Sequence, residues 1–135
     1  MAGTTRSRFL AAVGIVVQDL DTSIDFYVSI IGMQEAQRID VPDKSLVEVV
    51  LTFPGSRGAA LLLMKFNDGE DRAYRDDGGK VVLQVGDCVG VTEAARAAGY
   101  DVTREPGEYP GFGTIAMVSD PDGRTVELIG APAGG

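Results

Sequence analysis

The chain has 135 residues, of which 44% are apolar and 24% charged, the composition of a folded globular protein rather than a disordered one. Its formal net charge of −8 disfavours binding to nucleic acid and to anionic membrane surfaces. The single cysteine excludes a disulfide within the chain, and no apolar run reaches the roughly 20 residues of a membrane span. We therefore expect a compact cytoplasmic protein with neither nucleic-acid nor membrane partners.

The sequence contains no histidine. Histidine is the commonest protein ligand for transition metals and the commonest general base near neutral pH. Any mechanism that requires an imidazole from this chain is therefore excluded.

The first half of the chain predicts a strand, a helix and three further strands. Residues 9–17 are apolar and β-branched, which favours a strand. A helix follows, with Asp19 or Asp21 as its N-cap and Gly32 directly after its end. Its predicted apolar face has helical spacing and consists of Ile24, Tyr27, Val28 and Ile31. The three strands are predicted at about residues 34–41, 45–53 and 58–66.

The second half repeats this order. A strand over 80–85 leads to a helix that is capped by Asp87, closed by Gly99 and lined by Val91, Ala94, Ala95 and Ala98. Strands are predicted at about residues 100–105, 113–119 and 124–129. The repetition predicts an α+β fold of two tandem βαβββ modules, over residues 8–66 and 80–130, joined by a polar linker over 67–79.

Two motifs resemble one known family. Residues 16–27, VVQDLDTSIDFY, with Ile31-Gly32-Met33 resemble the opening of the vicinal-oxygen-chelate superfamily of glyoxalases, bleomycin-resistance proteins and extradiol dioxygenases. Residues 120–129, DPDGRTVELI, resemble its closing hairpin. The resemblance implies that the two modules curl into half-barrels around a cavity. It also implies a homodimer, sometimes formed by sharing modules between chains.

The resemblance further implies a metal held by one ligand on each of four strands. At those positions this chain has Ala12, Leu63, Lys80 and Glu127. Alanine and leucine offer no lone pair, and a protonated lysine repels a cation. We therefore expect no metal and no other cofactor.

Strand alternation predicts the lining of the cavity. If these four residues point inward, so do Leu10, Gly14, Val16, Leu61, Lys65, Val82, Gln84, Thr125 and Ile129, whereas Leu62 and Met64 pack beneath the helices. Residues 105–113 are rich in glycine and proline, which predicts either a lid over a ligand or an ordinary loop. The predicted ligand-binding residues are Ala12, Gly14, Leu63, Lys65, Lys80, Gln84, Tyr109, Phe112, Thr125 and Glu127.

Three functions are consistent with such a site. The first is metal-free binding of a small organic molecule, anionic or carbonyl-containing, for sequestration or resistance. Lys80 would anchor an oxygen and Glu127 would accept a hydrogen bond. The second is a metal-independent isomerase or lyase with Lys80 and Glu127 as catalytic residues, and the third is a glyoxalase I-like metal-dependent lyase with displaced ligands. The alternative for Lys80 and Glu127 is a purely structural ion pair. The alternative for Lys65 is a solvated position at the end of its strand.

Overall fold

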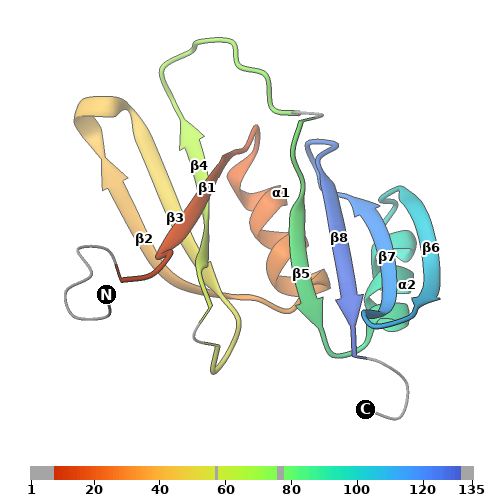
Figure 1. Cartoon of the computed structure of the whole chain (residues 1–135). Helices are drawn as coiled ribbons and strands as arrows, with labels where there is room; N and C mark the ends of the chain where they lie inside the picture. The colour runs from red at the N-terminus through yellow and green to blue at the C-terminus, as the bar shows by residue number, and fades with distance from the viewer. Residues whose placement is uncertain (1–7, 57, 76–77, 132–135) are drawn as a thin grey trace.

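The computed structural model describes residues 8–56, 58–75 and 78–131. It contains two four-stranded mixed sheets (Figure 1). The first has the order β1-β4-β3-β2 and consists of β1 (Ala12–Val16), β2 (Gln34–Val41), β3 (Leu46–Thr52) and β4 (Ala60–Phe66). The second has the order β5-β8-β7-β6 and consists of β5 (Val81–Val85), β6 (Val102–Tyr109), β7 (Gly113–Ser119) and β8 (Thr125–Gly130).

Each sheet is built in the same way. Its first strand pairs in parallel with its last, and the remaining pairs are antiparallel. The α+β fold of two tandem βαβββ units predicted from the sequence is thereby confirmed. Within the described residues no strand pairing joins the two sheets, so they do not close into a barrel.

The helices begin and end at the residues that the sequence singles out. The Asp19 carboxylate accepts a hydrogen bond from the Thr22 N–H at the start of α1 (Leu20–Asp25), at 2.9 Å. Asp87 caps α2 (Cys88–Ala97) in the same way. The predicted helix-ending glycines at 32 and 99 both adopt positive φ, of 100° and 93°, which a residue with a Cβ rarely adopts.

The first helix contains one more residue than the second between its cap and its glycine. Asp19 and Gly32 are 13 positions apart, and Asp87 and Gly99 are 12. After α1 the chain passes into a π-helix (Phe26–Ile30), which takes up the extra residue in a wider turn. Corresponding residues of the two modules are therefore 68 positions apart at the caps and 67 at the glycines.

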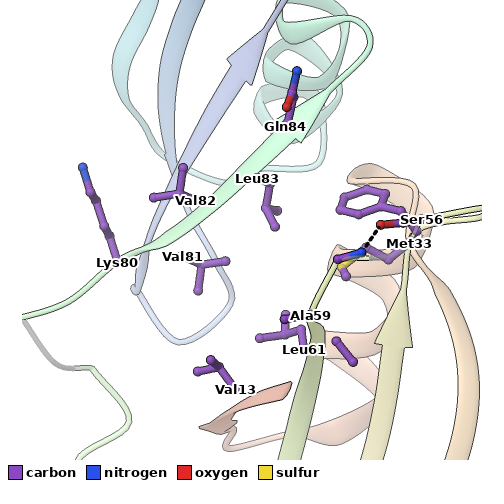
Figure 2. A pocket seen from close by; sticks show the side chains of 13 residues that line it. Val13, Met33, Ser56, Ala59, Leu61, Lys80, Val81, Val82, Leu83 and Gln84 are labelled. Carbon is purple, nitrogen blue, oxygen red and sulfur yellow. Dashed lines mark hydrogen bonds between the residues drawn. The ribbon is translucent and has the colours of Figure 1, made fainter. Parts of the chain in front are cut away.

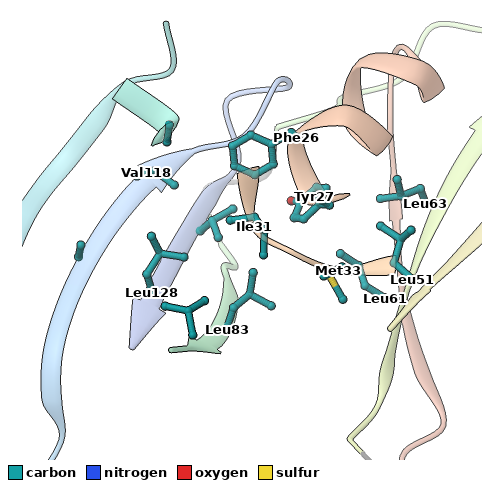
Figure 3. Packing of buried hydrophobic residues seen from close by; sticks show 14 of the residues in the cluster. Phe26, Tyr27, Ile31, Met33, Leu51, Leu61, Leu63, Leu83, Val118 and Leu128 are labelled. Carbon is teal, nitrogen blue, oxygen red and sulfur yellow. The ribbon is translucent and has the colours of Figure 1, made fainter. Parts of the chain in front are cut away.

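The first helical segment lies between the two sheets and joins them in one core. Figure 3 shows Phe26, Tyr27 and Ile31 with Leu61 and Leu63 on one side, and with Leu83 and Leu128 on the other. The predicted helix faces are only partly correct. Ile24 and Val28 are half-buried and Ala94 and Ala98 are exposed, whereas the buried polar residues Ser23 and Thr92 were not predicted.

A buried carboxylate links the two modules. Asp120 Oδ2 accepts hydrogen bonds from the Tyr27 hydroxyl at 2.8 Å and from Arg124 Nη1 at 2.7 Å. The other terminal nitrogen of Arg124 donates to the carbonyl oxygens of Val16 and Tyr74. All three side chains are buried. Their mutual hydrogen bonds matter because a buried polar group without a partner destabilises the fold.

One strand differs clearly from its prediction. The sequence predicts a strand over 100–105 and then a loop, whereas β6 continues to Tyr109, through Pro106 and Gly107. Irregular register between Val102 and Gly107 accommodates these two residues.

No helix in the described part of the chain has the length and apolar character to cross a membrane.

We predict that Asp120→Ala lowers the free energy of unfolding by about 3–5 kcal/mol, because it leaves the buried Arg124 charge without its carboxylate. Urea denaturation followed by circular dichroism measures this change. Glu93→Ala is the control, since it removes a carboxylate from the exposed Arg96–Glu93 pair, where a change below about 1 kcal/mol is expected. Equal effects of the two substitutions would contradict a linking role for Asp120.

Candidate functional site

Four of the predicted site residues lie on one face of the second sheet. In the parallel pair β5–β8, Val82 is paired with Glu127 and Gln84 with Ile129. Paired residues share a face and alternate residues along a strand return to it. Lys80, Gln84, Thr125 and Glu127 therefore occupy the face turned away from Leu83 and Leu128 of the core.

Lys80 and Glu127 form an ion pair on this face. Lys80 Nζ donates to Glu127 Oε1 at 2.8 Å. The lysine side chain is 48% exposed and the glutamate side chain 12%. The ammonium group is therefore accessible from solvent, while the carboxylate lies in a sheltered position among neighbouring strands.

The register of the strands identifies the equivalent positions in the first module. Gly14 is paired with Leu62 in β1–β4, as Val82 is with Glu127 in β5–β8. Gly14 precedes the cap Asp19 by five residues, and Val82 precedes Asp87 by the same number. Ala12 therefore corresponds to Lys80, and Leu62 corresponds to Glu127.

This register corrects the predicted orientation of β4. Leu63 was expected on the same face as Glu127, but it is fully buried in the core. A shift of one residue exchanges the two faces of a strand, so Leu62 and Met64 occupy the outer face with Ala12 and Gly14. Leu61 and Lys65 share the core-side register of Leu63, and the Lys65 ammonium donates to the backbone oxygen of Phe66.

The two aromatic candidates lie at the far end of the second sheet. Tyr109 is the last residue of β6, and its ring lies against the Arg104 guanidinium at 4.6 Å. Phe112 is in the following turn and is largely exposed. Residues 105–109 belong to a strand, so the segment predicted as a lid or loop is reduced to the turn before β7.

The donor set at the four equivalent positions does not fit a metal ion. Ala12 and Leu62 carry no donor atoms, and Lys80 already uses its ammonium group to bind the one carboxylate. In the part of the chain that the structure describes, no group of three or more acidic, cysteine or histidine side chains is placed to hold a metal. We therefore derive no chemical step through a metal.

A hollow lies between the modules, lined by Val13 of β1 and by the residues of β5. This seam groove has a volume of about 620 Å³. Figure 2 shows Val81 and Leu83 of β5 facing Leu61 and Met33 across it, while Lys80 extends away. Its lining residues are Val13, Met33, Phe53, Ser56, Gly58, Ala59, Ala60, Leu61, Lys80, Val81, Val82, Leu83 and Gln84.

Sequence reasoning missed most of this groove. It placed Leu61, Lys80, Val82 and Gln84 at the cavity, but it gave no place there to Met33, Phe53 or Ser56. Only the half-exposed valines at 13 and 82 distinguish the groove from an ordinary core, and exposure is not visible in a sequence.

Two ionisable groups that contact Asp120 have raised pKa values. Burial, followed by the negative charge of Asp120, raises the pKa of Asp122. Burial and the same carboxylate raise the pKa of Tyr27 well above its ordinary value. Tyr27 therefore remains a protonated donor to Asp120 throughout the physiological pH range.

Cys88 offers no reactive nucleophile. The side chain is buried beside Gly130 and its thiol donates to the Leu128 carbonyl. Burial raises the pKa of the thiol, which disfavours the thiolate.

The family model and the sequence relatives that match this chain indicate the same family. The family model described as "Glyoxalase/Bleomycin resistance protein/Dioxygenase superfamily" matches residues 9–128. A protein named lactoylglutathione lyase from Haemophilus influenzae is 36% identical over 115 residues, covering 84% of this chain and 85% of the relative. A lactoylglutathione lyase from Arabidopsis thaliana is also 36% identical, but this chain spans only 44% of its length.

Solved structures show the same fold. Glyoxalase I from Zea mays has a TM-score of 0.76 and 30% identity, covering 93% of this chain and 46% of that one. TnmS3, an antibiotic binding protein from Streptomyces sp. CB03234, has a TM-score of 0.72 over 94% of this chain and 98% of that one. Its identity is 20%, so this second likeness concerns the fold alone.

We predict that Glu127→Gln changes the free energy of unfolding by less than about 1 kcal/mol, because its partner Lys80 is half exposed and solvent screens the pair. Thermal and urea denaturation measure the change. A loss several times larger would show that the pair exists mainly to stabilise the fold.

Proposed function

Since the chain belongs to the glyoxalase, bleomycin-resistance protein and dioxygenase superfamily, we propose that it binds a small organic molecule without a metal, at Lys80 and Glu127. The proposal rests on the ion pair between these residues at 2.8 Å. They occupy positions at which the family resemblance implies metal ligands. A ligand with a carboxylate or carbonyl oxygen is the class that an accessible ammonium group recognises.

The two side chains have different roles in this proposal. The Lys80 ammonium donates to the ligand oxygen, either in addition to Glu127 or in its place, since an ammonium has three donors. Glu127 accepts a hydrogen bond from a ligand hydroxyl or amide and fixes the position of the lysine. Gln84 and Thr125, on the same face, add neutral hydrogen-bonding groups.

Sequestration of the ligand is the favoured outcome of binding. A metal-independent isomerase or lyase is the alternative, in which Glu127 moves a proton of the ligand and Lys80 stabilises the oxygen that gains charge. Turnover separates the two, because a sequestering protein returns its ligand unchanged.

The names of the sequence relatives favour a second candidate, a metal-dependent lyase of the glyoxalase I type. This chain lacks histidine, and its four equivalent positions supply one carboxylate that is already paired with a lysine. The identity to the relatives therefore supports the second candidate, and the donor chemistry supports the first.

We also propose a homodimer and a cytoplasmic location. The outer faces of both sheets carry half-buried apolar side chains, including Leu62, Met64 and Ile129, which a second copy would cover. Such a dimer would enclose the Lys80–Glu127 pair, which one chain leaves open on one side.

The direct test is calorimetric titration of the full chain with phenylpyruvate, which carries both a carboxylate and a ketone. We expect Lys80→Met to raise the Kd about tenfold to a hundredfold, through loss of a charged hydrogen bond. Glu127→Gln should weaken binding less. Lys44→Met, which removes an exposed lysine in the turn before β3, is the control and should bind as the unmodified chain does. Equal affinity in the Lys80 variant and the control would refute the proposed site.

The lyase candidate has its own test. The purified chain is assayed for formation of S-lactoylglutathione from methylglyoxal and glutathione, with and without added Zn²⁺ or Ni²⁺, and its metal content is measured. We expect neither activity nor a stoichiometric metal. Metal-dependent activity that Glu127→Gln abolishes would establish the lyase and overturn the metal-free proposal.

A further inference from the structure

A second positively charged side chain lies on the sheet face that carries Lys80 and Glu127. Glu127 of β8 is paired with Met117 of β7, and Met117 is paired with Arg104 of β6. Paired residues of neighbouring strands share a face, so Arg104 projects from the same face as Glu127, two strands further along the sheet. Because Lys80 also reaches Glu127, a positive side chain flanks this row of residues on either side.

A bulge in β6 directs Arg104 to this face. Val102, two positions earlier, is paired with the buried Val118 and packs against the core. Residues two positions apart on a regular strand share a face, but the register of β6 shifts between Val102 and Arg104. The extra residue turns Arg104 away from the core and onto the face of Glu127.

The Arg104 guanidinium lies against an aromatic ring on the same face. Tyr109 is paired with Gly113, which shares its face of β7 with Met117, and the Tyr109 ring centroid lies 4.6 Å from the guanidinium. Gly107 lies between the two residues in the strand and has no side chain to separate them. A cation–π contact of this kind orients a guanidinium without neutralising its charge.

No carboxylate of the described residues forms an ion pair with Arg104. The two glutamates nearest to it in β6 have other partners. Glu105 pairs with Arg96 of α2, and Glu108 accepts a hydrogen bond from the Thr114 hydroxyl at 2.8 Å. Arg104 is exposed, so its oriented guanidinium is available to an anion from solvent.

The first module lacks this second cation. Its corresponding row runs from Leu62 through Val50 to Gln37, and β2 has a register shift just before Gln37. A neutral side chain therefore occupies the position at which the second module has Arg104. The positive charge on β6 belongs to the second module alone and does not follow from the strand arrangement that both modules share.

We propose that this face binds a molecule with two carboxylate groups, one at Lys80 and the other at Arg104. The proposal rests on the Lys80–Glu127 site proposed above and defines the class of its ligand. The Lys80 ammonium contacts Glu127 on β8, and Arg104 belongs to β6, two strand spacings or about 10 Å away. Met117 lies between them and offers an apolar surface to the middle of the molecule.

The test is calorimetric titration of the full chain with adipate and with hexanoate, which have carbon chains of equal length but differ by one carboxylate. Adipate should bind with a Kd about tenfold lower, because it makes a second charged hydrogen bond at Arg104. Arg104→Gln should bring the two Kd values together by weakening adipate alone, since the carboxylate of hexanoate stays at Lys80. A merely structural role of Arg104 would weaken both ligands alike.

Arg38→Gln is the matched control, because Arg38 is an exposed arginine on β2 of the first module, where it pairs with Glu35. It should keep the preference for adipate, and circular dichroism checks that both variants are folded. Adipate that binds no more tightly than hexanoate to the unmodified chain overturns the proposal. A preference that survives in Arg104→Gln, or that Arg38→Gln also removes, overturns it as well.

Lys80→Met separates a failure of this proposal from a failure of the proposed function. If it weakens both ligands while Arg104→Gln leaves the preference for adipate unchanged, the Lys80–Glu127 site stands and the role of Arg104 is wrong. If Lys80→Met leaves the binding of both ligands unchanged, the Lys80–Glu127 site is wrong, and binding at two points is wrong with it.

Discussion

The structure depends on one buried carboxylate, that of Asp120. It accepts a hydrogen bond from Tyr27 of the first module and two from Arg124 of its own turn. Arg124 in turn holds the carbonyl oxygens of Val16, at the end of β1, and Tyr74, in the linker. These bonds tie β1, the linker and the start of β8 to the helical segment that carries Tyr27.

The parts of the fold predicted correctly from the sequence are those governed by local chemistry. Asp19 and Asp87 cap helices because a short carboxylate reaches the free N–H groups of a first turn. Gly32 and Gly99 end them because only glycine readily adopts positive φ. These signals recur in both halves, so the duplication and the βαβββ order were visible without a structure. The Lys80–Glu127 pair was also expected, because the family resemblance places both residues at inward-facing ligand positions.

The errors arose in segments where the sequence pattern does not determine which side chains face the core or which secondary structure forms. Residues 59–64 read AALLLM, and an unbroken apolar run does not show which side chains face the core. The face of β4 is set by its pairing with β1, which places Leu63 inward and Leu62 outward. Pro106 and Gly107 likewise read as a loop, although bulges accommodate them in a strand. The seam groove was not predictable, since it depends on the angle between modules rather than on any one segment.

The two modules have diverged in a way that bears on ligand chemistry. At the equivalent positions the second module has Lys80 and Glu127, whereas the first has Ala12 and Leu62. A metal ion needs donors distributed around it, and one polar half with one apolar half does not supply them. An organic molecule with one polar end requires the opposite arrangement, polar groups gathered on one side and apolar surface on the other. The asymmetry of the duplicated fold is thus itself an argument for an organic ligand at the Lys80–Glu127 face.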